Sequence, residues 1–356
     1  MAAPLAMMLA GGTGGHVYPA LAVALELRER GFRLQWIGTN RGLEARVLGE
    51  HAIPLNILPM RGLRGKGLLQ QVQTLFLLGL SLLQSLWLLL RFRPAVVIGM
   101  GGYVSFPAAI AAWLCRRPLM LQEQNAVAGS ANRALARFAK GIMTGFPAVL
   151  SQYKTAQYLG NPVRREIVLV AEDSPWGWDG KRPLQILVLG GSLGAEAINQ
   201  AVPALARALG AQCFWRHQCG AAHVPTTHQA FAEAGVGQCE VIAFIDDMRA
   251  AYAWADLVIC RAGALTIAEL AATGRPSILV PLPGAIDDHQ TANARFLSDA
   301  GAARLVPQAD LGDLESAVSA LLASPDELAG MAAAARDCAR PDATRMIADV
   351  AQELAA

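Results

Sequence analysis

The sequence predicts an α/β protein made of two similar, doubly wound halves, and three observations support this. An apolar run leads into a glycine-rich turn and then a helical pattern at two places, with the turns at residues 11–16 and 190–195. A strand, a tight turn and a helix with free N–H groups at its start can face an anion. A chain of 356 residues suits two domains. A hydrophobic content of 54% with 34 glycines suits parallel sheets buried on both faces.

In the first half, strand patterns alternate with helical ones. A helix is expected over residues 18–30, with Pro19 near its start and Gly31 after its end. The strands are expected at 5–10, 34–38, 95–99 and 119–122. This order predicts a doubly wound sheet, in which ligands bind beyond the carboxyl ends of the strands.

Residues 75–90 read LFLLGLSLLQSLWLLL and are the only segment that invites a membrane-spanning interpretation. Its sixteen residues are interrupted by Ser81, Gln84 and Ser85. The segment is shorter than the roughly 20 residues needed to span a bilayer. We therefore expect a crossover helix between two strands, with one face exposed.

The second half repeats the first. Strands are expected at 184–189, 212–216, 239–243, 256–260 and 277–281, with helices between them. Residues 168–182 are polar and rich in proline and glycine, which favours a linker. Residues 324–356 are expected to be helical, with a break at Pro341.

Charge divides the chain at the same place as the repeat. Residues 1–162 hold 16 Lys and Arg against 5 Asp and Glu, a net charge of +11. Residues 163–356 hold 14 against 23, a net charge of −9. A basic half predicts an anionic partner, such as an acidic lipid or a phosphorylated substrate. Nucleic acid is disfavoured, because the chain has no helix-turn-helix signature, no RNP-type aromatic motif and no basic tail.

Cysteine placement and the start of the chain point to the cytoplasm. The six cysteines form no C-x-x-C pair and lie mostly in apolar runs, which favours a reducing compartment. The glycine turn begins at residue 11, which leaves no room for a secretory signal before it.

The first glycine turn lacks the fingerprint of dinucleotide-binding domains. Counting from Gly12, the pattern G-x-G-x-x-G needs a glycine where the chain has Val17. The second strand ends without a carboxylate that could hold a ribose. NAD binding is therefore disfavoured.

His16 lies at the mouth of the first turn. Position alone favours a helix cap or a surface residue. The alternative is a general base, because an imidazole titrates near neutrality and the turn directs it toward the expected ligand.

The segment 261–269 follows a strand and opens a helix. Its small residues leave backbone N–H groups exposed, a suitable seat for a diphosphate. Glu269 could accept hydrogen bonds from a ribose diol, or could simply complement the helix dipole.

Asp287, Asp288 and His289 suggest a metal site at first sight. They have no further ligand at helical spacing, so a solvated loop with one polar sugar contact is expected instead.

Taken together and in order, the motifs closely resemble the MurG family, bacterial peptidoglycan enzymes that transfer N-acetylglucosamine onto a lipid-linked N-acetylmuramoyl-pentapeptide. The motifs are GGTGGHVYPALA, GLRGKG (62–67), GMGGYVSFP (99–107), EQN (123–125), GNPVR (160–164), GGSLGA, FIDDM (244–248), CRAGALTIAE and the loop 287–293. The resemblance implies a GT-B fold, with two Rossmann-like domains facing each other across a cleft. It implies domains at 1–162 and 163–340, with the C-terminal helix 341–356 packing back on the first.

The resemblance also assigns roles to residues of this chain. His16 would be the catalytic base. In the first half, donor contacts would come from Thr13, Gly14, Gly15 and Asn125. In the second half, UDP-N-acetylglucosamine (UDP-GlcNAc) would contact Arg164 and Ile245 near the uridine, Ser192 at the diphosphate, Glu269 at the ribose and Gln290 at the sugar. Further diphosphate contacts would come from the backbone of Gly263, Ala264, Leu265, Thr266, Ile267 and Ala268.

Two positions depart from the usual family pattern. Gln122 stands where the family usually has His, and Leu193 stands where it usually has Gln. The first leaves Asn125 intact. The second removes an amide near the phosphates, so Leu193 is not expected to contact the ligand.

The implied reaction is inverting transfer to the muramoyl 4-hydroxyl of the lipid-linked acceptor, lipid I, which gives lipid II. No cofactor is expected, since UDP-GlcNAc is a substrate. No metal is expected either, since helix N-termini can stabilise the diphosphate and the D-x-D pattern of metal-using enzymes is absent. The rival interpretations are a UDP-sugar epimerase, another glycolipid transferase of the same fold, and a catalytically silent sugar-nucleotide-binding module.

The expected location is the cytoplasmic face of the inner membrane, bound peripherally. The basic first half would attract an anionic surface, with about 1 kcal/mol from each nearby Lys or Arg. Trp87 and Trp113 would provide apolar anchors, ringed by Arg91, Arg93, Arg116, Arg117 and Lys140. Other cell-wall synthesis proteins are conceivable partners, which the residues do not identify.

Overall fold

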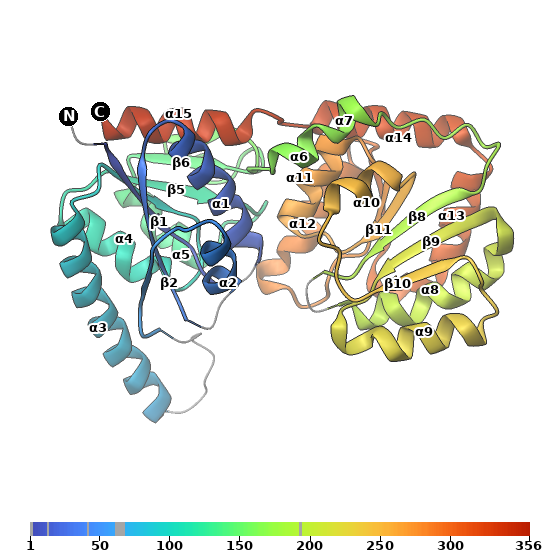
Figure 1. Ribbon diagram of the computed structural model, residues 1–356, viewed down its shortest axis with the longest axis horizontal. Coiled ribbons are helices and arrows are strands. Elements are labelled where there is room, and N and C mark those ends of the chain that lie inside the picture. The colour runs from blue at the N-terminus through green and yellow to red at the C-terminus, as the bar shows by residue number, and fades with distance from the viewer. Residues whose placement is uncertain (1–2, 13, 41–42, 61–67, 192–193) are drawn as a thin grey trace. The chain divides into compact units, whose positions relative to one another are not determined.

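The computed structural model describes residues 3–12, 14–40, 43–60, 68–191 and 194–356. The chain forms two compact units, one of residues Met1–Pro162 with Asp342–Ala356 and the other of residues Val163–Pro341. Figure 1 shows both units.

The first unit is built on a seven-stranded parallel sheet. Its strand order is β3-β2-β1-β4-β5-β6-β7, in which β1 and β4 are neighbours. The chain therefore reverses its direction of winding between β1 and β4, where ligands bind in open α/β sheets. The strands are β1 (Leu5–Leu9), β2 (Arg33–Gly38), β3 (Leu55–Ile57), β4 (Val96–Gly99), β5 (Leu119–Glu123), β6 (Gly141–Thr144) and β7 (Ala156–Tyr158).

Both faces of this sheet are covered by helices, which explains the continuous apolar runs. In β1, Ala6 and Met8 pack into one core while Met7 and Leu9 pack into another. The first core includes α1 and α15, and the second includes α3, α4 and α5. The helices are α1 (Gly14–Glu29), α2 (Leu43–Glu50), α3 (Leu68–Phe92), α4 (Ser105–Leu114), α5 (Ser130–Leu135) and α15 (Ala343–Ala355).

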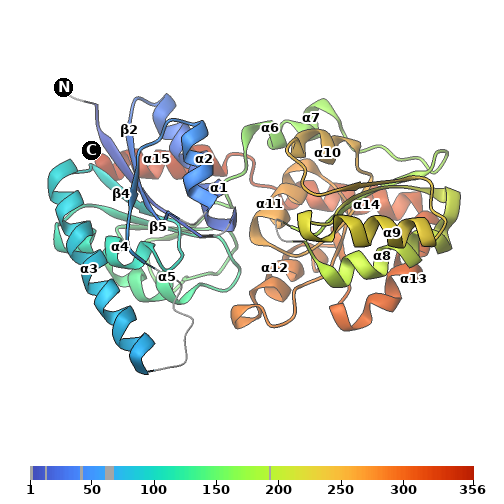
Figure 2. The same ribbon diagram turned by 60° about the horizontal axis from the view of Figure 1, so that its bottom comes forward.

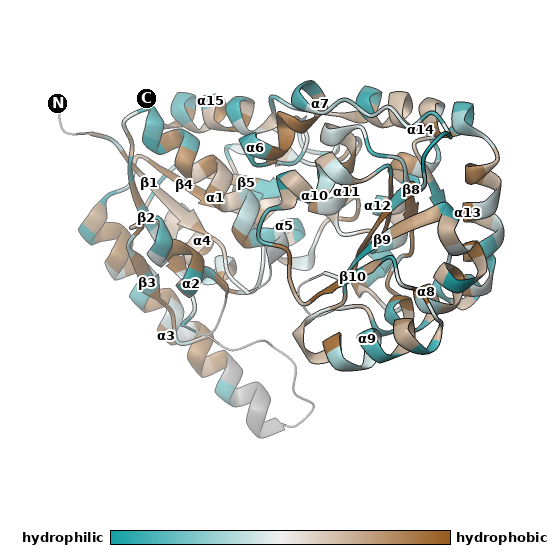
Figure 3. Cartoon of the chain, turned by 45° about the vertical axis from the view of Figure 1, so that its right-hand side comes forward, coloured by the Kyte–Doolittle hydropathy of each residue, from teal (hydrophilic) through white to brown (hydrophobic). Residues whose placement is uncertain are grey.

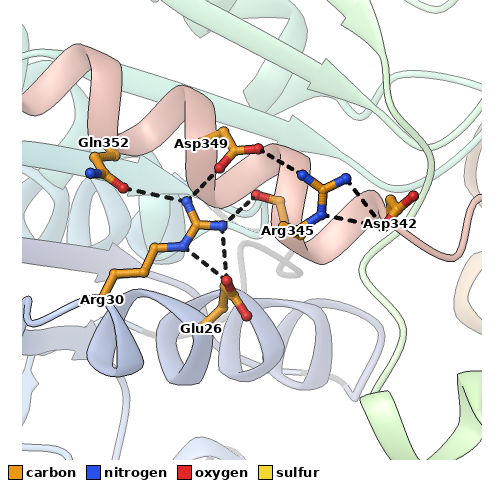
Figure 4. Close-up of polar contacts among 6 residues, drawn as sticks. All are labelled: Glu26, Arg30, Asp342, Arg345, Asp349 and Gln352. Carbon is orange, nitrogen blue, oxygen red and sulfur yellow. Dashed lines mark hydrogen bonds and ion pairs between the residues drawn. The ribbon is translucent and has the colours of Figure 1, made fainter.

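The last helix, α15, packs on α1 although it is the final element of the chain (Figure 1). Ile347, Ala348 and Ala351 are fully buried in the core beside α1. Arg30, which directly follows α1, donates to Asp349 Oδ1 at 2.6 Å and to the Arg345 carbonyl oxygen at 3.1 Å, as Figure 4 shows. Buried apolar contacts and the hydrogen bonds of Arg30 therefore hold α15 on the first unit.

Helix α3 is longer than the expected 75–90 segment. It runs from Leu68 to Phe92, and residues Leu75–Phe92 are long and apolar enough to cross a membrane by length and composition. The sequence argument that the segment is too short is therefore wrong. Only 22% of this 18-residue stretch is buried, and Figure 3 shows its hydrophobic colouring where it extends past the strands.

The second unit repeats the first. Its six-stranded parallel sheet has the order β10-β9-β8-β11-β12-β13, so β8 and β11 occupy the places that β1 and β4 occupy in the first unit (Figure 1). Figure 2 shows helices of this unit from a second direction, with α8, α9 and α14 labelled. The strands are β8 (Leu184–Leu189), β9 (Cys213–Gln218), β10 (Cys239–Ile242), β11 (Leu257–Cys260), β12 (Ser277–Leu279) and β13 (Ala303–Leu305). The α-helices are α6 (Arg165–Val168), α7 (Val170–Asp173), α8 (Glu196–Leu209), α9 (Val224–Glu233), α10 (Met248–Trp254), α11 (Ala264–Thr273), α12 (His289–Ser298), α13 (Leu314–Leu322) and α14 (Pro325–Cys338).

Residues 168–182 are not a linker, contrary to the sequence prediction. They belong to the second unit, where Val170 and Trp178 are buried. Arg182 forms two hydrogen bonds with Asp256, at 2.6 and 2.7 Å, and Trp176 donates to the Asp256 carbonyl oxygen. Trp176 and Trp178 pack against the core, so the segment is part of this unit despite its prolines and glycines.

Candidate active site

In each unit, two of the sequence motifs meet where the winding reverses. In the first unit, the glycine turn follows β1 and the Gly101-Gly102 turn follows the neighbouring strand β4. In the second, the turn at Gly190 follows β8 and the segment 261–263 follows β11. Parallel strands end at the same edge of a sheet, so each pair of motifs lies where open α/β sheets commonly bind ligands.

His16 lies in the first turn of α1 and is partly exposed. Its Nδ1 atom lies 3.1 Å from Oε1 of Gln124, which follows β5. Gly101 lies against the same imidazole in a left-handed conformation (φ 88°), where a Cβ atom would come 3.1 Å from Cε1 of His16. The structure thus brings three motifs that are distant in sequence around one imidazole.

Asn125 is held by a buried carboxylate. Glu123 is 2% exposed, and its Oε1 accepts from the backbone N–H of Asn125 at 3.0 Å. Its Oε2 accepts from the N–H of Gly129 at 3.0 Å and from Asn132 Nδ2 at 2.8 Å. Charge-assisted hydrogen bonds to Glu123 therefore fix the loop that carries Asn125.

A residue that the sequence analysis did not single out supports the first glycine turn. Glu44 of α2 is fully buried, and its Oε2 accepts from the N–H of Gly12 at 3.1 Å. Its Oε1 accepts from both the N–H and the hydroxyl of Thr39 at the end of β2. A Cβ atom at Gly11 would lie 2.6 Å from Oε1, so glycine there leaves room for the carboxylate beside the turn. Gly14 and Gly15 open α1, and Thr13 lies outside the described residues.

The second glycine turn is supported by an uncharged group at the corresponding place. Gly191 (φ 82°) donates its N–H to Oε1 of Gln218 at 3.0 Å, and Gln218 Nε2 donates back to the Gly191 carbonyl oxygen. Nε2 also donates to the Ala243 carbonyl oxygen, which ties the turn to the loop that carries half-buried Ile245. Ser192 and Leu193 lie outside the described residues. The two turns therefore differ, with a carboxylate under the first and an amide under the second.

Two predicted site residues of the second unit come together. Arg164 Nη2 lies 3.6 Å from Oε1 of Glu269, which is 6% exposed on α11. Tyr252 of α10, which the sequence analysis missed, donates its hydroxyl to Oε2 at 2.9 Å. Burial raises the pKa of Glu269, and the charge of Arg164 and the Tyr252 hydroxyl act against that rise. The carboxylate is therefore oriented by an arginine and a tyrosine.

The remaining predicted contacts lie around α11. This helix begins at Ala264, and Gly263 precedes it in an extended conformation, so the backbone N–H groups of Leu265 and Thr266 point out of its first turn. Gln290, in the first turn of α12, accepts from the Leu282 N–H at 2.9 Å. Arg261 instead donates to the carbonyl oxygens of Val280 and Pro281 and to Gln308, so its role here is structural.

The part of the chain that the structure describes contains no group of three or more His, Cys, Asp or Glu side chains that could hold a metal ion. Asp288 accepts a hydrogen bond from the Thr291 hydroxyl, and His289 Nδ1 lies 2.8 Å from the Ile286 carbonyl oxygen. The cluster of acidic residues and histidine at the start of α12 thus has local partners.

Comparison with known proteins identifies the family. Residues 6–144 match the N-terminal domain model of glycosyltransferase family 28, and residues 185–353 match its C-terminal domain model. The UDP-N-acetylglucosamine–N-acetylmuramyl-(pentapeptide) pyrophosphoryl-undecaprenol N-acetylglucosamine transferase of Alkalilimnicola ehrlichii is 51% identical over 98% of both chains. The crystal structure of Acinetobacter baumannii MurG is 36% identical, with a TM-score of 0.82 over 98% of this chain and 99% of that one.

A more distant match shows the fold alone. The UDP-GlcNAc 2-epimerase of Neisseria meningitidis has a TM-score of 0.70 over 98% of this chain and all of that one, but only 14% identity. High identity over nearly the full length is found with the transferase instead. The chain is a glycosyltransferase with two Rossmann-like domains, and it belongs to the family of UDP-N-acetylglucosamine–N-acetylmuramyl-(pentapeptide) pyrophosphoryl-undecaprenol N-acetylglucosamine transferases.

Proposed function

We propose that this chain transfers N-acetylglucosamine from UDP-GlcNAc to the 4-hydroxyl of undecaprenyl-diphosphate-linked N-acetylmuramoyl-pentapeptide, with inversion at the anomeric carbon. The observation that carries the proposal is the 51% identity over 98% of the chain to a transferase of that name, together with a positioned imidazole at the first glycine turn. We assign residues 1–162 to the acceptor and the membrane, and residues 163–340 to the donor.

The donor assignment is supported by the difference between the two glycine turns. Under the first turn, the buried carboxylate of Glu44 already takes the N–H of Gly12. A diphosphate that used the Gly12 N–H would compete with an existing negative group. Under the second turn, the N–H of Gly191 donates to the uncharged side-chain amide of Gln218. The UDP diphosphate is therefore assigned to the second turn, including Ser192, and to the backbone of residues 263–268.

The other donor contacts follow from the same placement. Glu269 is assigned to the ribose, where a carboxylate oriented by Tyr252 can accept from the diol. Arg164 and Ile245 are assigned to the uridine region and Gln290 to the sugar. Thr13, Gly14, Gly15 and Asn125 of the first unit are assigned to the transferred sugar and phosphate.

In the proposed reaction, the acceptor oxygen attacks the anomeric carbon and forms the new C–O bond. His16 accepts the hydroxyl proton as this bond forms. The bond between the anomeric carbon and the donor phosphate oxygen breaks, and its electron pair stays with the departing UDP. Backbone N–H groups at the start of α11 would stabilise that charge. The products are a β-1,4 linkage and UDP.

The direct test is incubation of the purified full chain with radiolabelled UDP-GlcNAc and a short-chain lipid acceptor analogue. We expect label in the lipid product and release of UDP, both strictly dependent on the acceptor. A chain that converts UDP-GlcNAc to its 2-epimer without acceptor would be an epimerase. A chain that binds the nucleotide with no turnover would be a silent binding module. Either result contradicts the proposal.

We further propose that an apolar stripe on α3 docks on an anionic bilayer at the cytoplasmic face. Phe76, Leu80, Leu83, Trp87 and Leu90 are 42–69% exposed, and their spacing of three and four residues places them on one face of the helix. The opposite face is buried, and α3 packs along α4, which adds exposed Trp113 and Leu114.

Charge around this stripe supports an anionic lipid surface as the occupant. The Arg91 guanidinium lies 5.3 Å from the Trp87 ring centroid, and the same unit carries further exposed cations. A helix packed on its own unit along one side suits docking on the surface better than spanning. The exposed cations are Arg91, Arg93, Arg116 and Lys140, with Arg117 half-buried.

A further inference from the structure

The side chain of Gln124 is aimed at the imidazole proposed as the base. Gln124 is 1% exposed, and its Oε1 lies 3.1 Å from Nδ1 of His16. An amide oxygen can only accept a hydrogen bond, whereas either imidazole nitrogen can donate or accept, depending on the tautomer. The orientation of this one amide therefore decides which nitrogen of His16 carries the proton.

That orientation is set by the backbone. The other end of the amide, Nε2, donates to the Gln122 carbonyl oxygen at 3.3 Å. A flipped amide would place its oxygen against that carbonyl oxygen, two acceptors with no proton between them. The oxygen of Gln124 therefore faces His16, so Nδ1 donates to it and Nε2 keeps its lone pair.

Both partners are held in place. The Gln124 carbonyl oxygen accepts from Asn161 Nδ2 at 2.9 Å, and the preceding residue, Glu123, anchors the loop that follows. On its other side, the His16 ring faces Gly101 and Gly102, whose φ angles of 88° and 83° favour glycine. The imidazole thus occupies a slot between a glycine turn and a fixed amide.

We propose that Gln124 is a positioning residue that holds His16 in the Nδ1–H tautomer, so that Nε2 is the atom that accepts the hydroxyl proton. This inference rests on the proposed function for the role of the proton. It also gives a reason for an amide at this place. An amide fixes the tautomer without adding a negative charge beside a site that receives a diphosphate-linked acceptor.

The test is the tautomer of His16 itself, read from nitrogen-15 chemical shifts of the histidine-labelled full chain at a pH where the imidazole is neutral, with His16→Asn to assign its signals. We expect the Nδ1–H form in the unaltered protein. Gln124→Met has a similar volume and no acceptor, so we expect His16 to shift toward the Nε2–H form. Gln124→Glu restores an acceptor and should restore the Nδ1–H form. Gln122→Met is the matched control, because it removes a neighbouring buried amide that does not contact His16.

Kinetics give the second readout. With Gln124→Met we expect kcat to fall roughly tenfold to hundredfold, part of the about 10²- to 10⁴-fold that a general base contributes. The dissociation constant of UDP should not change. An Nε2–H form in the unaltered protein, or an unchanged tautomer in Gln124→Met, would overturn the inference. Full transfer activity in His16→Ala would overturn the proposed role of His16 instead, and the chemical shifts would still decide what Gln124 does.

Discussion

At the scale of single residues, a substitution of His16 should slow the chemical step without weakening donor binding. His16→Ala should lower kcat about 10²- to 10⁴-fold, because the variant has no group to accept the hydroxyl proton. UDP affinity should be nearly unchanged, because the nucleotide is assigned to the second unit. Steady-state kinetics and calorimetric titration of UDP measure the two effects. Full turnover with unaltered affinity would make His16 a structural residue.

A substitution of Glu269 should instead weaken donor binding. Glu269→Ala removes a charged acceptor from the ribose, which costs roughly 1.5–3 kcal/mol of binding free energy. UDP affinity should fall accordingly in calorimetric titrations. Tyr252→Phe should weaken UDP binding less, because it loosens the carboxylate without removing it. A UDP dissociation constant that stays the same in Glu269→Ala would leave Glu269 a purely structural role.

His217 predicts a dependence of stability on pH. It is fully buried on β9, with Nε2 2.9 Å from Asn199 Oδ1, and burial lowers its pKa to about 4. In the unfolded chain its pKa is about 6.5. Between these values the unfolded chain binds the proton and the folded chain does not, so the free energy of unfolding falls as pH falls from 6.5 to 4.

The size of this effect is about 3 kcal/mol over that range. It can be isolated by urea unfolding of the unaltered chain and of His217→Gln at several pH values. The difference in the free energy of unfolding between the two proteins should change with pH in this window and be constant above it. A constant difference throughout would mean that the pKa of His217 is the same in the folded and unfolded protein.

The residues that support the site were harder to predict than those that line it. His16, Asn125 and Glu269 lie in motifs directly after strands, where topology alone predicts a ligand. Glu44 and Gln218 lie outside those motifs, and only the fold brings them under the glycine turns. Tyr252 is seventeen residues before Glu269, and no local pattern links a tyrosine on α10 to a carboxylate on α11.

At the scale of elements, α3 makes the membrane proposal testable. Sedimentation with vesicles should show binding that requires anionic lipid and weakens with salt. Trp87→Glu should reduce it, because a charge replaces an exposed aromatic anchor. Phe214→Glu is the matched control, since it changes an exposed aromatic residue of the second unit. Equal binding to neutral vesicles, or loss of binding in the control alone, would refute docking through α3.

Long periodic elements were predicted from the sequence, and short or irregular ones were not. The helices at the first glycine turn and at the C-terminal end, including the break at Pro341, are confirmed. Strands β3, β6, β7 and β13 were missed. Each has only three or four residues, and β3, β7 and β13 lack the fully buried run that marks β12. The segment 168–182 was misread because proline and glycine content does not show that Trp178 is buried.

At the scale of the whole molecule, the proposed chemistry runs without a metal ion. Transfer should proceed at an unchanged rate in excess EDTA, because helix N-termini at the glycine turn and at α11 are proposed to stabilise the departing diphosphate. The assay should include a divalent-ion control. Loss of transfer in chelator, with recovery on adding a divalent ion, would contradict this part of the mechanism.

The position of α15 also sets an order of events during synthesis. The first unit lacks Ile347, Ala348 and Ala351, which complete its core, until α15 has left the ribosome. The second unit is one continuous stretch and needs no later segment. The second unit can therefore finish folding first, although the first unit is synthesised earlier, because the first unit still lacks α15. A nascent chain that stalls before Asp342 would carry a native second unit and an incomplete first one.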